Sequence, residues 1–415
     1  MASFSSVQAV IQVFNFLSGI LIVRFLTKPD YAWFTIANTF VSTLGMLADS
    51  GTSGALSAIG GTVWQDDARF GSLIRTALTL RRKLATAAVI LVTPIFVWLL
   101  ARNEAPAATL WLVVVAGLLG FSFQLTAGIL GMVISLRQEI RKMQALGLAT
   151  GLFRLVLIGS ACFVFIDARV AVIIGMCTLA LQSWVLRRWV SASIESHAPL
   201  SADYRARILA VVKKQAPLTI FYCLQSQIIV WLISIFGSTQ RVAEIGALGR
   251  FSMIFAVMTA VINGIVVPRF ARCQDRRTLK RRYIQVVVGV VMLTGSLAAL
   301  GAIFPRALLW VLGAKYASLE NEVWLMMTSA SLAATGATLY ALNFSKAWIA
   351  PVRISIPMEI VTLIILILCM DISTVRGALW FNCLSYIPPI LLFIAIACLQ
   401  LRKATPPETA TCEEN

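Results

Sequence analysis

Charged side chains are scarce in this chain of 415 residues. Asp, Glu, Lys and Arg supply 13% of the sequence and hydrophobic residues supply 59%, whereas a soluble domain contains about 25% charged and about 45 to 50% apolar residues. This scarcity excludes a soluble globular protein. Apolar runs of about 20 residues, the length of a helix that crosses a bilayer, instead predict an all-α polytopic membrane protein.

Residues that serve chemistry are scarce as well. The sequence has one His, His197, and its 8 Cys form no CxxC pair, so paired imidazoles, a zinc site and a disulfide framework are not expected. No nucleotide-binding motif is present, and we expect no cofactor. The excess of 35 Lys and Arg over 18 Asp and Glu would suggest nucleic acid as the partner of a soluble protein. In a membrane protein the positive-inside rule explains it, and no nucleic acid is expected.

Twelve apolar runs bounded by charges, Pro or Gly predict twelve transmembrane helices in two sets of six. The first set covers residues 5–26, 31–49, 84–101, 109–136, 146–166 and 168–190, and the second covers 215–236, 245–267, 284–304, 323–345, 354–370 and 377–401. We therefore expect an N-terminal six-helix bundle over 1–190 and a C-terminal six-helix bundle over 215–401. Residues 191–214 would form a cytoplasmic linker with a short surface helix, and residues 402–415 a disordered cytoplasmic tail.

Basic residues are distributed unevenly between alternate loops. Loops two, four, six, eight and ten together with the tail hold 25 Lys and Arg, and the remaining loops hold 7. The positive-inside rule therefore predicts that both termini are cytoplasmic. The loop over residues 269–282 holds 7 of these basic residues. It is interpreted either as an anchor on anionic inner-leaflet lipids or as a site that captures an anionic substrate headgroup.

Polar residues form one stripe on each of several predicted spans. Inside a membrane each polar group needs a partner or a water-filled cavity, so the positions of these residues around the helix are informative. The stripes of spans one and two comprise Ser5, Gln8, Gln12, Asn15, Asn38, Ser42, Gly45 and Asp49. An offset of 214 residues leads from all of them but Asn15 to polar or small residues in spans seven and eight, namely Thr219, Tyr222, Ser226, Ser252, Ala256, Thr259 and Asn263.

This shared offset predicts that the second six spans repeat the first in parallel orientation. Spans one, two, seven and eight would then face each other across a hydrophilic substrate-binding cavity, as in transporters built from repeats. The alternative is that the polar residues bridge tightly packed helices without a cavity.

Arg154 is the most deeply placed charge in the predicted spans. It lies some eight residues into span five, on the same face as Gly147 and Gly151, a spacing typical of helix-packing surfaces. Arg at a helix centre costs about 2.5 to 3.5 kcal/mol on insertion scales, and a guanidinium does not escape the cost by deprotonation. The position favours contact with a substrate phosphate or saccharide, or else a structural ion pair.

Four further charges lie in or at the edge of spans. Asp49 and Glu359 are candidates for coupling transport to an ion gradient, although Glu359 could instead pair with Arg353. Arg24 and Arg250 lie near the outer surface and off the polar stripes. Snorkelling of their long side chains to the interface explains both.

Several short segments resemble polysaccharide flippases of the MOP exporter superfamily. The run Val23-Arg24-Phe25-Leu26-Thr27-Lys28-Pro29-Asp30-Tyr31-Ala32 resembles the end of helix one and the first outer loop of that family, and Asp49-Ser50-Gly51 resembles the end of helix two. In the second half the similar segments are Gln215-Ala216-Pro217-Leu218, Glu244-Ile245-Gly246, Pro268 and Gly313-Ala314-Lys315-Tyr316. Thr27 and Ala32 stand where family members often carry Gly.

The resemblance implies a bacterial inner-membrane protein with a MATE-like fold, in which two six-helix bundles form a V. Such proteins flip undecaprenyl-pyrophosphate-linked oligosaccharide across the membrane by alternating access, for O-antigen, capsule or exopolysaccharide assembly. A glycan polymerase and a chain-length regulator are possible partners. With no nucleotide motif, the energy would come from an ion gradient, substrate pull or a partner.

Two other classes of function remain open on the sequence. A MATE-like multidrug or cation antiporter would share the fold, but its cargo favours inner carboxylates over an inner Arg, and Asp49 is the main candidate. A membrane glycan polymerase or O-acyltransferase would need catalytic groups on a sizeable outer loop or an intramembrane His. The longest outer loop, about 305–322, holds neither, so we do not expect an enzyme.

The charge asymmetry makes a testable prediction about topology. Cysteine labelling or reporter fusions should report the cytoplasm at Ala68, Arg205 and Gln274, because the basic loops are retained on that side. The same reporters should indicate the outside at Glu104, Thr239 and Ser318. An inverted result at Thr239 alone would refute the arrangement of six spans followed by six.

Overall fold

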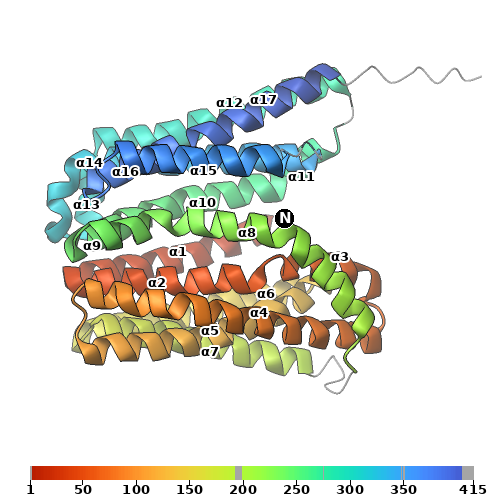
Figure 1. The fold of residues 1–415 in the computed structure, drawn as a ribbon, viewed down its shortest axis with the longest axis horizontal. Helices are drawn as coiled ribbons and strands as arrows, with labels where there is room; N and C mark the ends of the chain where they lie inside the picture. Colours follow the sequence, from red (N-terminus) through yellow and green to blue (C-terminus); the bar gives the residue numbers. More distant parts are fainter. Residues whose placement is uncertain (1, 192–198, 274, 347, 349–350, 404–415) are drawn as a thin grey trace, which may run out of the picture. The chain divides into compact units, whose positions relative to one another are not determined.

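The computed structural model describes residues 2–191, 199–273, 275–346, 348 and 351–403. Over these residues it contains helices and turns and no strand (Figure 1). Eleven helical segments are long and apolar enough to cross a membrane. A twelfth helix, α2 (Lys28–Asp49), has 22 residues, enough for a span, but its polar residues keep it out of the eleven. The chain is thus a multi-pass helical membrane protein. The tail predicted to be disordered lies outside the described residues beyond Lys403.

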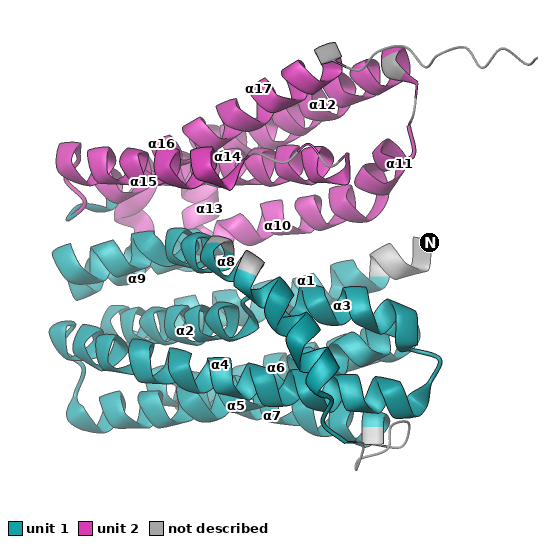
Figure 2. Cartoon of the chain, turned by 45° about the vertical axis from the view of Figure 1, so that its right-hand side comes forward, with its two compact units in different colours: residues 1–250, 311–313, 373–375 teal, residues 251–310, 314–372, 376–415 magenta. Residues whose placement is uncertain are grey.

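The helices divide between two compact units (Figure 2). Unit 1 comprises residues 1–250 with 311–313 and 373–375, and unit 2 comprises residues 251–310, 314–372 and 376–415. The helices of unit 1 are α1 (Ala2–Phe25), α2 (Lys28–Asp49), α3 (Thr52–Val63), α4 (Asp67–Arg102), α5 (Ala107–Leu136), α6 (Ile140–Val164), α7 (Ala168–Ser191), α8 (Ala202–Phe236) and α9 (Thr239–Leu248).

Unit 2 begins within the short 3-10 helix η1 (Gly249–Phe251). Its remaining elements are α10 (Ser252–Val261), the π-helical turn η2 (Ile262–Val266), α11 (Val267–Ala271), α12 (Arg276–Ile303), most of α13 (Pro305–Leu312), η3 (Ala314–Leu319), α14 (Glu320–Ser345), α15 (Val352–Cys369), most of α16 (Val375–Ser385) and α17 (Ile387–Lys403).

Each predicted span lies on a helix, but several helices differ from the prediction in length or continuity. Span eight is divided among α9, η1, α10, η2 and α11, and span twelve is interrupted at Tyr386, just before Pro388 and Pro389. The helices α3 and α13 lie in stretches predicted as loops. Part of the predicted linker, from Ala202 onward, is the first part of α8 and runs without a break through Pro217 into span seven. The division of the chain into two bundles at 191–214 stays a prediction.

Local sequence signals explain the ends of many helices. Side chains of Thr27, Asp66, Ser201 and Asp275 each accept a hydrogen bond from the backbone amide three residues on, which satisfies one of the free donors of a first turn. Between α2 and α3 the backbone enters the left-handed region at Ser50 (φ 35°) and Gly51 (φ 90°). Gly51 adopts this conformation without a steric penalty, so the chain reverses there within two residues.

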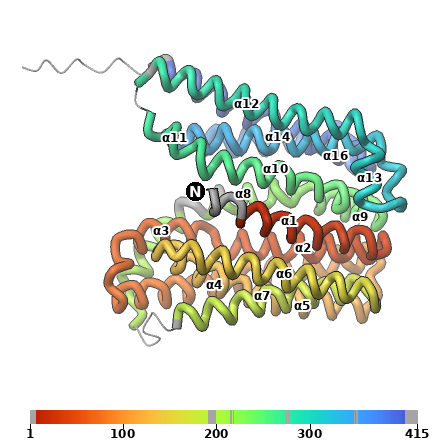
Figure 3. The backbone as a smooth tube through the Cα atoms, turned by 180° about the vertical axis from the view of Figure 1, so that it is seen from behind, coloured from red at the N-terminus to blue at the C-terminus, as the bar shows by residue number. Residues whose placement is uncertain are grey.

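Unit 1 has a core at the end where α2 gives way to α3. Buried side chains from α3, α4, α5, α7 and α8 form it, and Phe70, Leu73, Leu186 and Ile208 are completely buried there. Further along α2, the rings of Phe40 and Phe96 stack with centroids 3.9 Å apart. Figure 3 shows α1 and α6 side by side, and their contact agrees with that view. In unit 2, a smaller core around Phe270, Tyr283 and Leu342 joins α11, α12 and α14.

The helices α2 and α9 approach closely within unit 1. Tyr31 is completely buried, and its hydroxyl donates a hydrogen bond of 3.1 Å to the carbonyl oxygen of Gly246. Nearby, the Lys28 ammonium lies 2.8 Å from the Glu244 carboxylate. A Cβ on Gly246 would lie 2.8 Å from Cγ2 of Thr35, so the backbone approach depends on glycine.

We predict that Gly246→Ala destabilises the protein by about 1 to 3 kcal/mol, because the added methyl overpacks the α2–α9 contact. Thr35 has little room to turn away, since its hydroxyl donates a 2.8 Å hydrogen bond to the Tyr31 carbonyl. Thermal denaturation of the purified protein in detergent measures the effect.

Gly175→Ala in α7 is the matched control, because a Cβ there meets nothing within 4 Å. We expect it to be neutral or stabilising by up to about 1 kcal/mol, since alanine favours the helix more than glycine. Equal stability of the two variants would contradict the close approach at Gly246.

Candidate functional site

Helices α2 and α8, which carry two of the predicted polar stripes, lie next to each other in unit 1. The Ser226 hydroxyl is 3.7 Å from the Met46 sulfur, and the Cys223 thiol is 3.7 Å from the Thr43 carbonyl oxygen. Asn38 and Ser226 are exposed, whereas several other stripe residues of unit 1 are half-buried, among them Gln8, Gln12, Asn15, Ser42 and Tyr222. The contacts to α8 come from Thr43 and Met46 of α2, whereas Gly45 of the α2 stripe faces Gln124 of α5. Whether substrate binds to them stays a prediction.

Two of the predicted cavity residues belong to unit 2. Thr259 lies on α10 and Asn263 on η2. The Thr259 hydroxyl donates to the Phe255 carbonyl oxygen one turn earlier at 2.9 Å, which satisfies it within its own helix. Asn263 is exposed in the π-helical turn, a local distortion that often occurs at functional sites.

Arg154 lies on α6, ten residues before the helix ends at Val164. The packing face predicted from Gly147 and Gly151 is confirmed, because a Cβ on Gly147 would meet Ile11 and one on Gly151 would meet Phe14, both on α1. The Arg154 Nε is buried and has no hydrogen-bond partner among the described residues. Nor does the described part of the chain offer Arg154 a carboxylate within ion-pair distance.

Arg250 lies near enough to Arg154 for the two positive charges to repel each other. The Arg250 Nε donates a 2.9 Å hydrogen bond to the Tyr31 hydroxyl. Its guanidinium carbon lies 5.9 Å from the ring centroids of both Tyr31 and Phe34, within the usual range of a cation–π contact. These contacts hold the side chain against the first turns of α2, and its predicted snorkelling to the outer interface stays a prediction.

Helix α1 supplies a glycine beside Arg250. A Cβ on Gly19 would lie 3.2 Å from Nη1 of Arg250, so a larger residue would press on the guanidinium. Ser18 is completely buried, and its hydroxyl has no hydrogen-bond partner among the described residues. Arg154 and Arg250, from α6 and η1, thus form a cationic centre that we call the arginine pair. The chemistry available to it is the binding of an anion.

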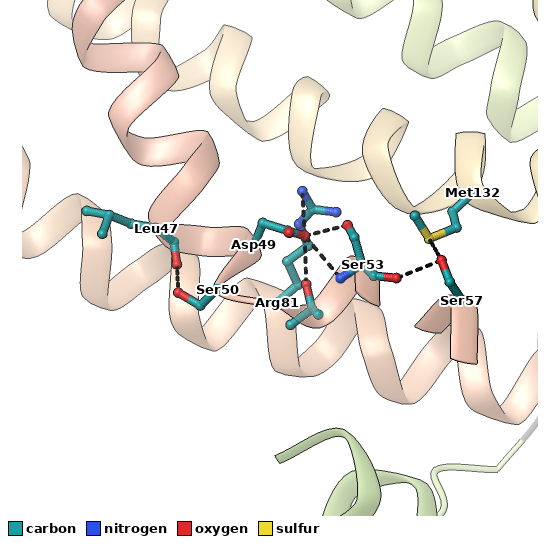
Figure 4. A network of polar contacts seen from close by, with 8 residues as sticks. Leu47, Asp49, Ser50, Ser53, Ser57, Arg81 and Met132 are labelled. Carbon is teal, nitrogen blue, oxygen red and sulfur yellow. Dashed lines mark hydrogen bonds and ion pairs between the residues drawn. The ribbon is translucent and has the colours of Figure 1, made fainter. Parts of the chain in front are cut away.

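Asp49 is engaged in a different network, at the other end of α2 (Figure 4). Its carboxylate accepts hydrogen bonds from the Thr52 hydroxyl at 3.0 Å and from the Ser53 amide at 3.1 Å, as well as from the Ser53 hydroxyl. The Arg81 guanidinium of α4 lies 3.6 Å away. Asp49 therefore caps the first turn of α3 and balances part of the charge on Arg81. Sequence reasoning missed this role because α3 was predicted as loop.

The second candidate for ion coupling, Glu359, lies on α15 in unit 2 and is 3% exposed. Its burial fits the predicted intramembrane position. Among the residues that the structure describes, no three or more His, Cys, Asp or Glu gather so that they could hold a metal ion.

No protein-family model and no curated protein sequence matches this chain. Among solved structures, an inward-facing multidrug resistance MATE transporter of the MOP superfamily aligns over 96% of this chain and 100% of its own, with a TM-score of 0.70 and 13% identity. The lipid II flippase MurJ in an inward closed conformation aligns over 99% of this chain and 94% of its own, with a TM-score of 0.66 and 12% identity.

A third similar structure is a MOP superfamily transporter from Pyrococcus furiosus, which is described as having a binding pocket of reverse polarity. It covers 97% of this chain and 95% of its own, with a TM-score of 0.57 and 14% identity. Identities at this level show a shared fold. The MATE-like all-helical fold predicted from the sequence is therefore confirmed.

We predict that Asp49→Asn destabilises the protein by about 1 to 3 kcal/mol, between the values for exposed and fully buried ion pairs. The Asp49 side chain is 29% exposed and that of Arg81 is 10% exposed. A double-mutant cycle of Asp49→Asn with Arg81→Gln, followed by thermal denaturation, measures the coupling between them.

The Asp67–Arg137 pair is the control for this cycle, because the Asp67 side chain is 68% exposed and its coupling should be about 0 to 1 kcal/mol. Unchanged stability of Asp49→Asn together with loss of transport would instead support the coupling role predicted from the sequence.

Proposed function

We propose that this protein flips undecaprenyl-pyrophosphate-linked oligosaccharide across the bacterial inner membrane by alternating access, for surface polysaccharide assembly. The observation that carries the proposal is the arginine pair. Two guanidinium groups from different helices lie near each other inside a membrane protein, and in the described chain neither has a carboxylate partner. A pyrophosphate anion supplies the missing negative charge.

The energetic argument follows from the cost of burying charge. An arginine at a helix centre costs about 2.5 to 3.5 kcal/mol on insertion scales, and a second like charge nearby adds repulsion. A helix bundle tolerates such a pair where the arginines meet water or an anionic ligand. Guanidinium groups bind phosphate oxygens through two parallel hydrogen bonds, so a pyrophosphate matches both the charge and the geometry of the donors.

The polar stripes support binding of the oligosaccharide, the second part of the proposed cargo. The half-buried amides of Gln8, Gln12 and Asn15 offer donors and acceptors along α1, and Ser42 and Tyr222 add hydroxyl groups on α2 and α8. Sugar hydroxyls bind to such groups. Our proposed contacts for the cargo are Arg154, Gln8, Gln12, Asn15, Ser42, Tyr222, Asn38, Asp49, Ser226, Thr259 and Asn263.

A MATE-like multidrug or cation antiporter is the second candidate function. The similarity to the MATE transporter at a TM-score of 0.70 favours it, since the fold is shared. Against it, the carboxylate of Asp49 is already bonded to Thr52, Ser53 and Arg81 and offers little free negative charge to a cationic drug. A drug-efflux assay in cells that express the protein separates the two candidates.

The proposal also covers membrane topology and partner proteins. The excess of basic residues in alternate loops supports two cytoplasmic termini, and a glycan polymerase and a chain-length regulator would act on the flipped product. We do not propose an enzyme. The structurally similar proteins are described as transporters and a flippase.

We predict that Arg154→Ala abolishes surface glycan while the amount of membrane-inserted protein stays the same. The anion loses one of its two guanidinium partners, whereas no carboxylate of the described chain is left unpaired by the change. Arg154→Lys should keep partial activity, because the charge survives but the two-pronged hydrogen bonding does not. Surface polysaccharide and inserted protein are quantified in parallel.

Arg169→Ala is the control variant, because Arg169 lies in unit 1 but is paired with Asp167 at 2.6 Å and has an exposed fraction of 42%. It should leave glycan export intact. A parallel fall of protein level and glycan in Arg154→Ala would indicate a structural role, and normal export by that variant would refute substrate binding by Arg154.

A further inference from the structure

A second cluster of arginines lines a cavity between α4, α5 and α7 in unit 1. The cavity has a volume of about 170 Å³, and its lining includes Arg81, Arg82, Arg187, Ser122 and Thr126. We call it the arginine cavity. Arg81 forms its buried wall and is 8% exposed, whereas Arg82 and Arg187 are exposed at its rim.

The cavity has more donors than the described chain uses. The Arg81 Nε is buried and has no hydrogen-bond partner among the described residues. Within the described part of the chain, the Arg187 guanidinium donates to the Thr126 hydroxyl alone, at 3.4 Å. Helix α5 makes room for Arg81 at Gly128, where a Cβ would lie 3.0 Å from Nη1. The side chains are thus arranged around a space with unsatisfied hydrogen-bond donors.

The charge of the cavity is not balanced by the described chain. Its three arginines carry three positive charges, and the ion pairs of this region give them one partner, Asp49, at 3.6 Å from Arg81. That carboxylate already accepts hydrogen bonds from Thr52 and Ser53. About two positive charges therefore remain, which favours a phosphate or phosphodiester anion as the ligand.

The position of the cavity favours a lipid as the source of that phosphate. Arg82 comes two residues before the apolar stretch 84–101, and Arg187 comes three residues before the end of the apolar helix Ala168–Val190. Residues at these places lie at the level of lipid headgroups. Basic pockets between membrane helices on the cytoplasmic side bind anionic headgroups, and the charge asymmetry of the loops predicts that this end is cytoplasmic.

The arginine cavity is distinct from the arginine pair. Asp49, the partner of Arg81, and Tyr31, the partner of Arg250, lie on the same helix, 18 residues apart, a separation of about 27 Å along its axis. A ligand in the cavity therefore occupies the opposite end of α2 from the arginine pair, and its binding does not depend on which cargo the protein carries.

We propose that the arginine cavity binds the phosphate of an anionic phospholipid headgroup in the leaflet facing the basic loops. Arg81 supplies the buried donors, and Arg82 and Arg187 close on the phosphate from the rim. Ser122 and Thr126 add hydroxyl groups, and the acyl chains lie outside the cavity along the exposed apolar surfaces of α4 and α5, which include Ile90, Leu91 and Leu119.

Native mass spectrometry of the full-length protein in detergent tests the proposal. Phosphatidylglycerol and phosphatidylcholine are titrated in turn, and the double variant Arg82→Gln, Arg187→Gln is compared with the unchanged chain. We expect preferential binding of phosphatidylglycerol and about 30-fold weaker binding by the double variant, about fivefold for each charge removed near the membrane surface. Arg81 is left in place because its loss would also affect Asp49.

Arg188→Gln is the matched control. Arg188 is the next residue on α7, but its guanidinium lies over the Trp184 ring, 4.9 Å from the centroid, and does not line the cavity. Equal weakening by Arg188→Gln, or equal affinity of the unchanged chain for the two lipids, would overturn the proposal. Displacement of phosphatidylglycerol by millimolar inorganic phosphate would overturn the lipid assignment in favour of a free anion. If the double variant does not fold, Arg187→Gln alone should weaken binding about fivefold.

Discussion

The proposed ligands of this protein all depend on one constraint. Positive charge lies within the helix bundle, and the described chain does not neutralise it. In water a guanidinium is solvated from all sides, but within a helix bundle it needs a carboxylate, an aromatic face, a cavity or a ligand. Arg250 obtains the rings of Tyr31 and Phe34. Arg154 obtains a packing face on α1 and no counter-charge. Where folding leaves a charge in this condition, an anion becomes the natural ligand.

The two arginine centres differ in how the fold maintains them. The arginine pair depends on close helix packing, with Gly19 of α1 next to Arg250 and Gly151 of α6 against Phe14 of α1. The arginine cavity depends on a turn, because the left-handed residues Ser50 and Gly51 return the chain so that Asp49 can cap α3 and reach Arg81. One α-helix, α2, orients a partner of each centre, Tyr31 at one end and Asp49 at the other.

Sequence reasoning predicted the spans well because hydrophobicity is a property of each segment alone. The sequence also predicted the packing face of the helix that carries Arg154, since Gly147 and Gly151 mark that face at helical spacing. Sequence reasoning failed where the contacts of a side chain come from a distant segment, as with the rings of Tyr31 and Phe34 beside Arg250. Asp49 looked free because α3 is a short helix with little periodic signal, and its cap is visible only in three dimensions.

The Lys28–Glu244 contact bears on how the two predicted repeats could have evolved. The predicted offset of 214 makes Glu244 the counterpart of Asp30 and Val242 the counterpart of Lys28, so in a homodimer of an ancestral half both copies would have formed this ion pair across a two-fold axis. After duplication and fusion of the gene, the two copies of such a contact can change independently. On that hypothesis Lys28 and Glu244, 2.8 Å apart, are the retained pair, Val242 replaces the second lysine, and Asp30 is left to accept the amide of Ala168 at 3.3 Å.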